Sequence, residues 1–240
     1  MTSLLIATNN PGKLLEFQEL LRDTNVTLVN PAQIGLDLEV VEDGHTYAEN
    51  AAKKAVAFAQ ASGLISLADD SGLEVDALDG APGLYSARYG STDGSKLSDA
   101  ERRKYLLSQL QDKPRPWTAH FHATIAIALP TNPVILSPSA SLRLNSAKDL
   151  GHQKTETLQS PLMGSFRVTN EEVYLFDGFC PGEIIPEERG TGGFGYDPIF
   201  LLTELGKTMA ELTMDEKNRL SHRARAVMKA KEILKTLFTN

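Results

Sequence analysis

The chain has 240 residues, 41% of them hydrophobic, which is enough for one large or two small domains with a sizeable core. Its formal net charge of -7 argues against general affinity for nucleic-acid backbones, because such proteins need clustered surface cations. The single cysteine, Cys180, excludes an intrachain disulfide, and no apolar run approaches the ~20 residues of a membrane span. Since the N-terminus also lacks a basic signal-peptide region, we expect a cytoplasmic protein with neither nucleic acid nor membrane as a partner.

The first predicted elements are a strand, a loop and a helix. Residues 4–7 are apolar, and residues 14–21 carry apolar side chains at helical spacing. Between them, Asn10 can cap the helix and Pro11 suits its first position. Free N–H groups at a helix start favour an anion, and Lys13 adds positive charge, so the loop is a candidate phosphate site. An ordinary capped helix explains the same residues, and the loop is not a Walker A sequence.

A second strand is predicted over 26–29, followed by a loop over 31–44 that carries Glu42. An Ala-rich helix over 46–61 then opens with a Thr-x-x-Glu capping box. Lys54 lies on this helix, where lysine side chains are usually solvated.

Two adjacent carboxylates, Asp69 and Asp70, follow a predicted buried strand over 64–68. Ligands of open α/β sheets bind beyond the carboxyl ends of strands. Because successive strand residues point to opposite faces, the two carboxylates can converge only if the chain turns there, which Ser71 and Gly72 permit. Paired carboxylates suit a Mg²⁺ ligand and a general base. Taken alone, the same residues are better explained by an Asx-turn that closes a strand.

The remainder of the chain continues to alternate strand and helix patterns. The predicted elements are a strand over 73–78, a capped helix over 98–110, a β-rich run over 120–129, strands over 173–176 and 182–185, and one long capped helix over 213–237. Residues 130–170 are rich in Pro, Ser, Thr and Asn and have weak periodicity. This segment predicts an inserted arm or hairpin within a single domain over 1–240.

Two further segments have compositions that suit nucleotide binding. Four glycines surround Phe194 and Tyr196 in the segment 190–200, so that backbone could approach a ligand and a base could stack on an aromatic ring. A glycine-rich hairpin with core aromatics is an equally good reading. Basic residues also crowd the first half of the last helix, where such a face is ordinarily solvated. They include Lys217, His222 and Arg223.

These segments form a series of ordered motifs over most of the chain outside 130–170. The motifs occupy residues 7–13, 49–51 with Lys54, 68–73, 80–89, 190–200, 216–217 and 221–223. Together they closely resemble the inosine/xanthosine triphosphate pyrophosphatase family, the Ham1-like hydrolases of non-standard purine nucleotides. The segment 130–170 is longer than the pattern of this family.

The resemblance implies an α/β fold of two lobes around a long, twisted mixed β-sheet, with flanking helices and a central cleft. It also implies a homodimer that needs Mg²⁺ as cofactor. The implied reaction is hydrolysis of ITP, dITP or XTP to the monophosphate and pyrophosphate, which removes these purines from the nucleotide pool.

The resemblance further implies roles for individual residues. Asp70 would be the catalytic proton acceptor, and the metal would be held by Glu42 and Asp70 with Asp69 in support. Donors such as His222 and Arg223 would favour a 6-oxo purine over adenine, since an unpaired buried donor costs ~1–3 kcal/mol. The implied substrate-binding residues are Thr8, Asn9, Asn10, Pro11, Gly12, Lys13, Lys54, Ser71, Phe194, Gly195, Tyr196, Asp197, Lys217, His222 and Arg223.

Two alternatives use the same residues. The first is a phosphatase that releases orthophosphate from a nucleoside triphosphate. The second is a nucleotide-binding sensor without turnover, although a sensor would not need a base beside its metal.

Overall fold

The structure is a computed structural model that describes residues 3–130, 164–168 and 171–238. Within these residues the strands form one mixed sheet in the order β2-β1-β3-β4-β6-β7-β8, and β5 pairs with β6. The chain divides into two compact units, each assembled from separate segments. Unit 1 comprises residues 1–70, 124–176 and 227–240, and unit 2 comprises residues 71–123 and 177–226.

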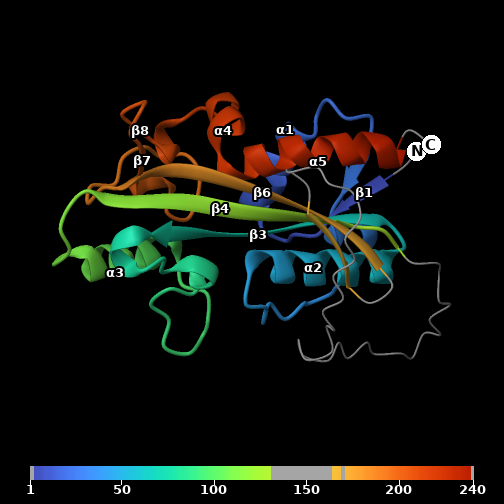
Figure 1. The fold of residues 1–240 in the computed structure, drawn as a ribbon, viewed down its shortest axis with the longest axis horizontal. Coiled ribbons are helices and arrows are strands. Elements are labelled where there is room, and N and C mark those ends of the chain that lie inside the picture. The colour runs from blue at the N-terminus through green and yellow to red at the C-terminus, as the bar shows by residue number, and fades with distance from the viewer. Residues whose placement is uncertain (1–2, 131–163, 169–170, 239–240) are drawn as a thin grey trace. The chain divides into compact units, whose positions relative to one another are not determined.

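Unit 1 begins with β1 (Ser3–Ile6), which pairs in parallel with β2 (Thr27–Val29) and with β3 (Ile65–Val75). Its helices are α1 (Pro11–Leu20), α2 (Tyr47–Ser62) and the C-terminal part of α5 (His222–Phe238). In this unit α2 covers one face of the sheet, and α1 and α5 cover the other (Figure 1). The buried hydrophobic core of this unit packs α2 against the strands. It includes Leu5, Ala51, Ala55, Phe58 and Ala126.

Unit 2 contains α3 (Asp99–Leu110), α4 (Met214–Leu220) and two short strands, β7 (Phe200–Leu202) and β8 (Lys207–Thr208). Side chains of β4 (Trp117–Ala128) alternate here between core and surface, as expected of a half-buried strand. The core of unit 2 includes Leu73, Leu106, Trp117, Phe121 and Phe200.

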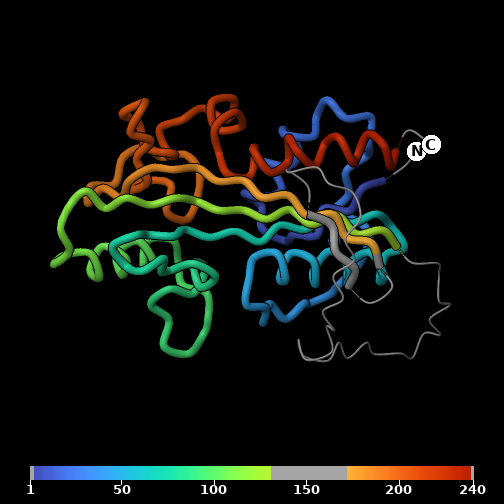
Figure 2. The backbone as a smooth tube through the Cα atoms, in the orientation of Figure 1, coloured from blue at the N-terminus to red at the C-terminus, as the bar shows by residue number. Residues whose placement is uncertain are grey.

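Three long strands contribute residues to both units, and the backbone of each can be followed in Figure 2. They are β3, β4 and β6 (Glu171–Ile184), and they pass from one unit to the other at residues 70/71, 123/124 and 176/177. Asp70 is therefore the last residue of its segment in unit 1, and Ser71 is the first of the next segment in unit 2.

The α/β class and most predicted elements are confirmed, but three predictions of local structure are wrong. The chain does not turn at Ser71 and Gly72, because β3 continues through them to Val75. The separate strand predicted over 73–78 is therefore the end of β3, and residues 76–78 form a 3-10 turn. The two strands predicted over 173–176 and 182–185 are one strand, β6. The long helix predicted over 213–237 is interrupted at Ser221, whose backbone is extended (φ -65°, ψ 155°).

The inserted arm predicted over 130–170 lies mostly outside the described residues. Its described part is β5 (Gly164–Val168), which pairs antiparallel with the start of β6. In the part of the chain that the structure describes, every helix is too short or too polar to span a bilayer.

Candidate active site

The first loop is organised by its own side chains. Asn10 caps α1, and its Oδ1 accepts hydrogen bonds from the backbone N–H groups of Gly12 (2.9 Å) and Lys13 (3.1 Å). The hydroxyl of Thr8 accepts a bond from the N–H of Asn10 (3.1 Å). The loop predicted to bind phosphate is therefore a helix-capping loop, in which Asn10 already engages two of the N–H groups expected to meet an anion. Asn9 of this loop and Pro11, the first residue of α1, are both exposed.

Asp69 and Asp70 face different partners because they are neighbours in a regular strand. The carboxylate of Asp69, only 1% exposed, forms an ion pair with Lys13. Asp70 instead accepts a hydrogen bond from Asn50 Nδ2 (3.0 Å). The structure thus brings the first loop and both carboxylates together without the turn that the sequence suggested.

Lys54 of α2 connects these carboxylates with the loop before the helix. Its ammonium donates to the backbone carbonyl of Asp69 (3.1 Å) and forms an ion pair with Glu42. Burial opposes the positive charge of Lys54, but Glu42, Asp70 and Asp69 outweigh it and raise the lysine pKa. Lys54 therefore stays charged among three carboxylates and is not a solvated helix lysine.

The pKa of Asp70 is raised above its ordinary value. Desolvation by burial is the main cause, and Lys54 and Lys13 only partly oppose it by favouring the charged form. A carboxylate with a raised pKa is a better proton acceptor than an exposed one, which suits the role of general base.

Asn50 is a site residue that the sequence reasoning missed. It is 4% exposed, it donates to Asp70, and its Oδ1 accepts from the N–H of Gly44 (2.8 Å). A Cβ at Gly44 would lie 2.7 Å from that oxygen, so the close approach requires glycine. Asn50 thereby links Asp70 to the loop that carries Glu42. The sequence feature that could have indicated this role is a polar amide among the alanines of the predicted helix.

The donor set of this group fits a hard divalent cation. Mg²⁺ commonly takes one or two carboxylates and completes its shell with water and substrate phosphates. Among the described residues, no group of three or more His, Cys, Asp or Glu side chains is arranged to hold a metal ion. Glu42 and Asp70 both interact with Lys54 and supply the oxygen donors. Asp69 is engaged by Lys13, so its position suits support of that lysine rather than ligation.

A second group of predicted residues lies in unit 2. Lys217 donates to the Oδ2 atom of Asp197 (2.7 Å), and both side chains are only 7% exposed. The same oxygen accepts from the N–H of Phe194 (3.0 Å). The Lys217 ammonium lies 5.0 Å from the centre of the Phe194 ring, and the Arg223 guanidinium carbon lies 5.9 Å from it. A buried ion pair therefore fixes an aromatic face with cations beside it.

The break at Ser221 places the last basic residues. Ser221 caps α5 by accepting a hydrogen bond from the N–H of Ala224 (3.1 Å). His222 follows directly and stacks on Phe121, with ring centres 4.8 Å apart. Arg223, 1% exposed, donates to the hydroxyl of Ser71 (3.1 Å). These side chains are buried, so the alternative of a solvated basic helix face is wrong for them.

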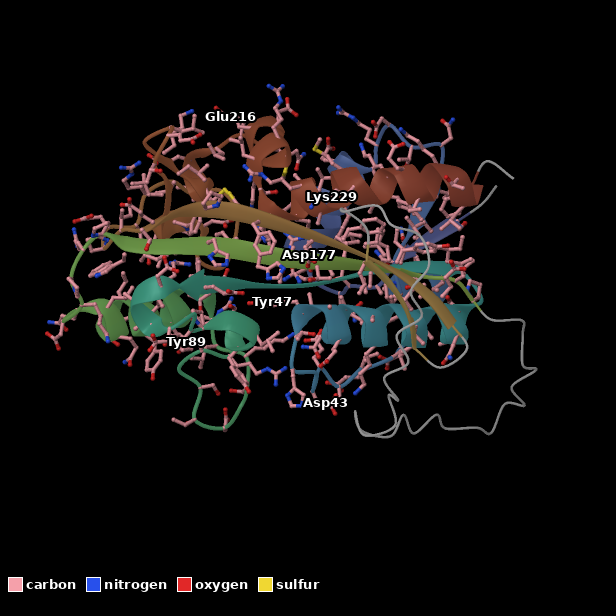
Figure 3. All side chains as sticks on the ribbon, viewed as in Figure 1. Asp43, Tyr47, Tyr89, Asp177, Glu216 and Lys229 are labelled. Carbon is pink, nitrogen blue, oxygen red and sulfur yellow. The ribbon has the colours of Figure 1, made fainter. Side chains whose placement is uncertain are left out.

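The residues of the glycine-rich segment 190–200 have different roles in this second group. Tyr196 is 3% exposed within the core, and its hydroxyl donates to the carbonyl of Ser86 (2.9 Å), so it supports the segment from inside. Gly195 is held through both of its backbone groups by α3. Phe194 is the aromatic that stays partly exposed. The side chains of both units are drawn in Figure 3, where Asp43 marks the loop before α2.

Comparison with known proteins identifies the family. Residues 4–141 and 147–233 match the model of the Ham1 family. The chain is 40% identical to a dITP/XTP pyrophosphatase of Desulforamulus reducens, over 98% of this chain and 96% of that protein. It is 37% identical to a dITP/XTP pyrophosphatase of Bacillus subtilis, over 98% of each chain.

Solved structures agree with this result. A HAM1 protein from Coxiella burnetii aligns with a TM-score of 0.72 and 33% identity, covering 98% of this chain and 100% of the other. The Staphylococcus aureus Ham1 protein aligns with a TM-score of 0.71 and 31% identity, covering 98% and 99%. With the motifs, the fold and these relatives in agreement, the chain belongs to the Ham1 family.

Proposed function

We propose that this protein hydrolyses ITP, dITP and XTP to the nucleoside monophosphate and pyrophosphate. The observation that carries the proposal is the group in unit 1, where Lys13, Lys54 and Glu42 surround two consecutive strand carboxylates. Relatives named dITP/XTP pyrophosphatase, matched over nearly their full length, support the choice of substrate and products.

The phosphate end of the substrate would be bound by the first loop. Lys13 and Lys54 supply two positive charges, and the α1 N-terminus supplies a favourable dipole. In the structure each lysine is paired with a carboxylate, so a bound triphosphate would compete with Asp69 and Glu42 for these cations.

Asp70 would orient and deprotonate the attacking water. The water oxygen forms a bond to the α-phosphorus, and the bond from that phosphorus to the α–β bridging oxygen breaks. The water proton passes to the Asp70 carboxylate, and pyrophosphate leaves with the bridging oxygen. Asn50 donates to the Oδ2 atom of Asp70 and so helps to orient this carboxylate.

Glu42 and Asp70 would hold Mg²⁺, which supplies neutralisation of the negative charge that develops on the leaving pyrophosphate. The oxygen-only donor set supports this choice over a softer metal.

The purine would be recognised by the residues of unit 2. The Phe194 ring offers a stacking face, and Arg223 and His222 offer donors that suit the 6-oxo group of hypoxanthine and xanthine. The amino group of adenine would meet these donors as another donor, which disfavours ATP.

A homodimer and a cytoplasmic location, both implied by the family resemblance, are part of the same proposal. Light scattering after gel filtration tests the dimer, and a mass of one chain would contradict it.

Product analysis tests the reaction. The protein is incubated with ITP, XTP, dITP, ATP or GTP, with and without Mg²⁺, and the products are separated by chromatography. IMP and pyrophosphate from ITP support the proposal, whereas IDP and orthophosphate support the phosphatase alternative. The variant Asp70→Asn is expected to bind ITP without turnover, and retained turnover would refute the assignment of the base. Binding of ITP by the unmodified protein without any product would support the sensor alternative.

A further inference from the structure

The glycine-rich segment of unit 2 is held by one helix through both backbone groups of Gly195. The N–H of Gly195 donates to Asp99 Oδ2 (2.6 Å), and its carbonyl accepts from Arg103 Nη1 (2.8 Å). Asp99 and Arg103 are four residues apart on α3 and so lie on one face of the helix. Gly195 has a φ of +64°, a conformation that favours glycine, and the two bonds fix that conformation.

The two side chains that hold Gly195 are themselves braced. Arg103 makes a two-pronged ion pair with Glu188, at 2.8 Å from Nε and 2.9 Å from Nη2. Asp99 forms an ion pair with Arg102, which also donates to the carbonyl of Ser86 (3.2 Å). The contact with Gly195 is therefore part of a connected network and not an isolated surface bond.

The residue after Gly195 belongs to the same network. The Tyr196 hydroxyl donates to the Ser86 carbonyl, the acceptor that Arg102 also uses. Ser86 Oγ accepts from the N–H of Leu73 (2.9 Å) and donates to the carbonyl of Gly83 (2.6 Å). This gives a role to the sequence motif over 80–89, which has no place in the proposed chemistry.

The segment held in this way carries the residues on either side of Gly195 and Tyr196. Phe194 presents its ring to Lys217 and Arg223, and Asp197 pairs with Lys217. A change in the Gly195 backbone would thus move the stacking face relative to the cations beside it.

We propose that Asp99 and Arg103 are positioning residues for purine recognition, acting through Gly195 on Phe194 and Asp197. The inference rests on the proposed function, since it explains what holds the purine-binding residues Phe194 and Asp197 in position. Asp99 and Arg103 act through the Gly195 backbone and not by contact with the reacting atoms. Their removal is expected to weaken purine binding and selectivity while the chemical step stays nearly unchanged.

The test compares Arg103→Met with Lys104→Met. Both variants remove one positive charge from α3, but Lys104 is an exposed neighbour outside the network. For Arg103→Met we expect KM for ITP to rise about tenfold, the effect of losing one charge-assisted hydrogen bond, with kcat changed by less than about twofold. The ratio of kcat/KM for ITP to that for ATP is expected to fall as well. Lys104→Met is expected to match the unmodified protein.

A second pair of variants separates positioning from general stability. Asp99→Asn keeps an oxygen that can accept from Gly195, whereas Asp99→Ala removes it. We expect Asp99→Asn to keep KM near that of the unmodified protein and Asp99→Ala to raise it. Hydrogen exchange of peptides covering 190–197 is expected to quicken in Arg103→Met and Asp99→Ala only.

The outcomes distinguish this inference from the proposed function. If the unmodified protein forms no pyrophosphate from ITP, the proposed function fails and the inference falls with it. If the unmodified protein and Lys104→Met are active, and folded Arg103→Met keeps their KM and their ITP to ATP ratio, the inference alone is refuted. Equal losses of kcat in Arg103→Met and Asp99→Ala at unchanged KM would also refute it.

Discussion

Replacing Asn50 by alanine removes both links that this side chain makes in unit 1. The hydrogen bond to the Asp70 carboxylate involves a charged group and contributes ~1.5–3 kcal/mol, and the bond from Gly44 contributes ~1 kcal/mol. Alanine is the better helix former by up to ~0.7 kcal/mol, which offsets part of the loss. We therefore expect the free energy of unfolding to fall by about 2–3 kcal/mol, and Tm to fall by about 4–12 °C for a chain of this length.

The same substitution is expected to lower kcat for ITP, because Asp70 and the loop that carries Glu42 lose their common partner. Urea unfolding gives the stability, and pyrophosphate release gives kcat. The matched control is Gln18→Ala, which removes an exposed amide from the interior of α1. If Asn50→Ala and Gln18→Ala have the same unfolding free energy and the same kcat, the role assigned to Asn50 is refuted.

Three further predictions concern other parts of the molecule. Lys217→Met leaves the Asp197 carboxylate buried without its cation, so we expect a loss of about 3–5 kcal/mol in urea unfolding; a loss below about 1 kcal/mol would contradict the buried pair. Burial raises the pKa of the Cys180 thiol to about 11, so the folded protein should not react with a thiol reagent at pH 8, and the reaction should appear only on unfolding. EDTA is expected to stop pyrophosphate release from ITP and added Mg²⁺ to restore it; turnover that persists in EDTA would exclude a metal role for Glu42 and Asp70.

The sequence predicted the helix starts well because capping is local. Asn10, Thr46, Ser98 and Thr213 each accept hydrogen bonds at the helix starts expected of them. Ser221 caps α5 in the same way. The hydrophobic pattern continues from α4 into α5 without interruption, so periodicity predicted one helix and did not reveal that α4 ends before Ser221.

The turn at Ser71 and Gly72 was predicted from residue types that favour turns, and tertiary structure overrode that preference. β3 lies between β1 and β4 in the sheet, and its pairing with β1 ends at Leu67, yet the strand continues through Ser71 and Gly72 to Val75. The convergence of the site does not need a turn, because helices bring Lys13 and Asn50 to the carboxylates.

Burial of the basic residues could not be read from composition. A helix face with several cations is usually solvated, and Arg225 in α5 is indeed exposed. Lys217 and Arg223 are buried because Asp197 and Ser71, distant in sequence, supply their partners. Only the family resemblance placed them in a site.

The lysines of unit 1 are each neutralised within the protein, Lys13 by Asp69 and Lys54 by Glu42. An anion can pair with either lysine only if that lysine gives up its carboxylate partner. The affinity for the anion therefore depends on the difference in free energy between the new ion pair and the old one. Because each lysine exchanges one negatively charged partner for another, we expect the affinity for phosphate at this end of the site to vary little with ionic strength. Selectivity against abundant small anions then follows from exchange rather than from a strongly positive surface.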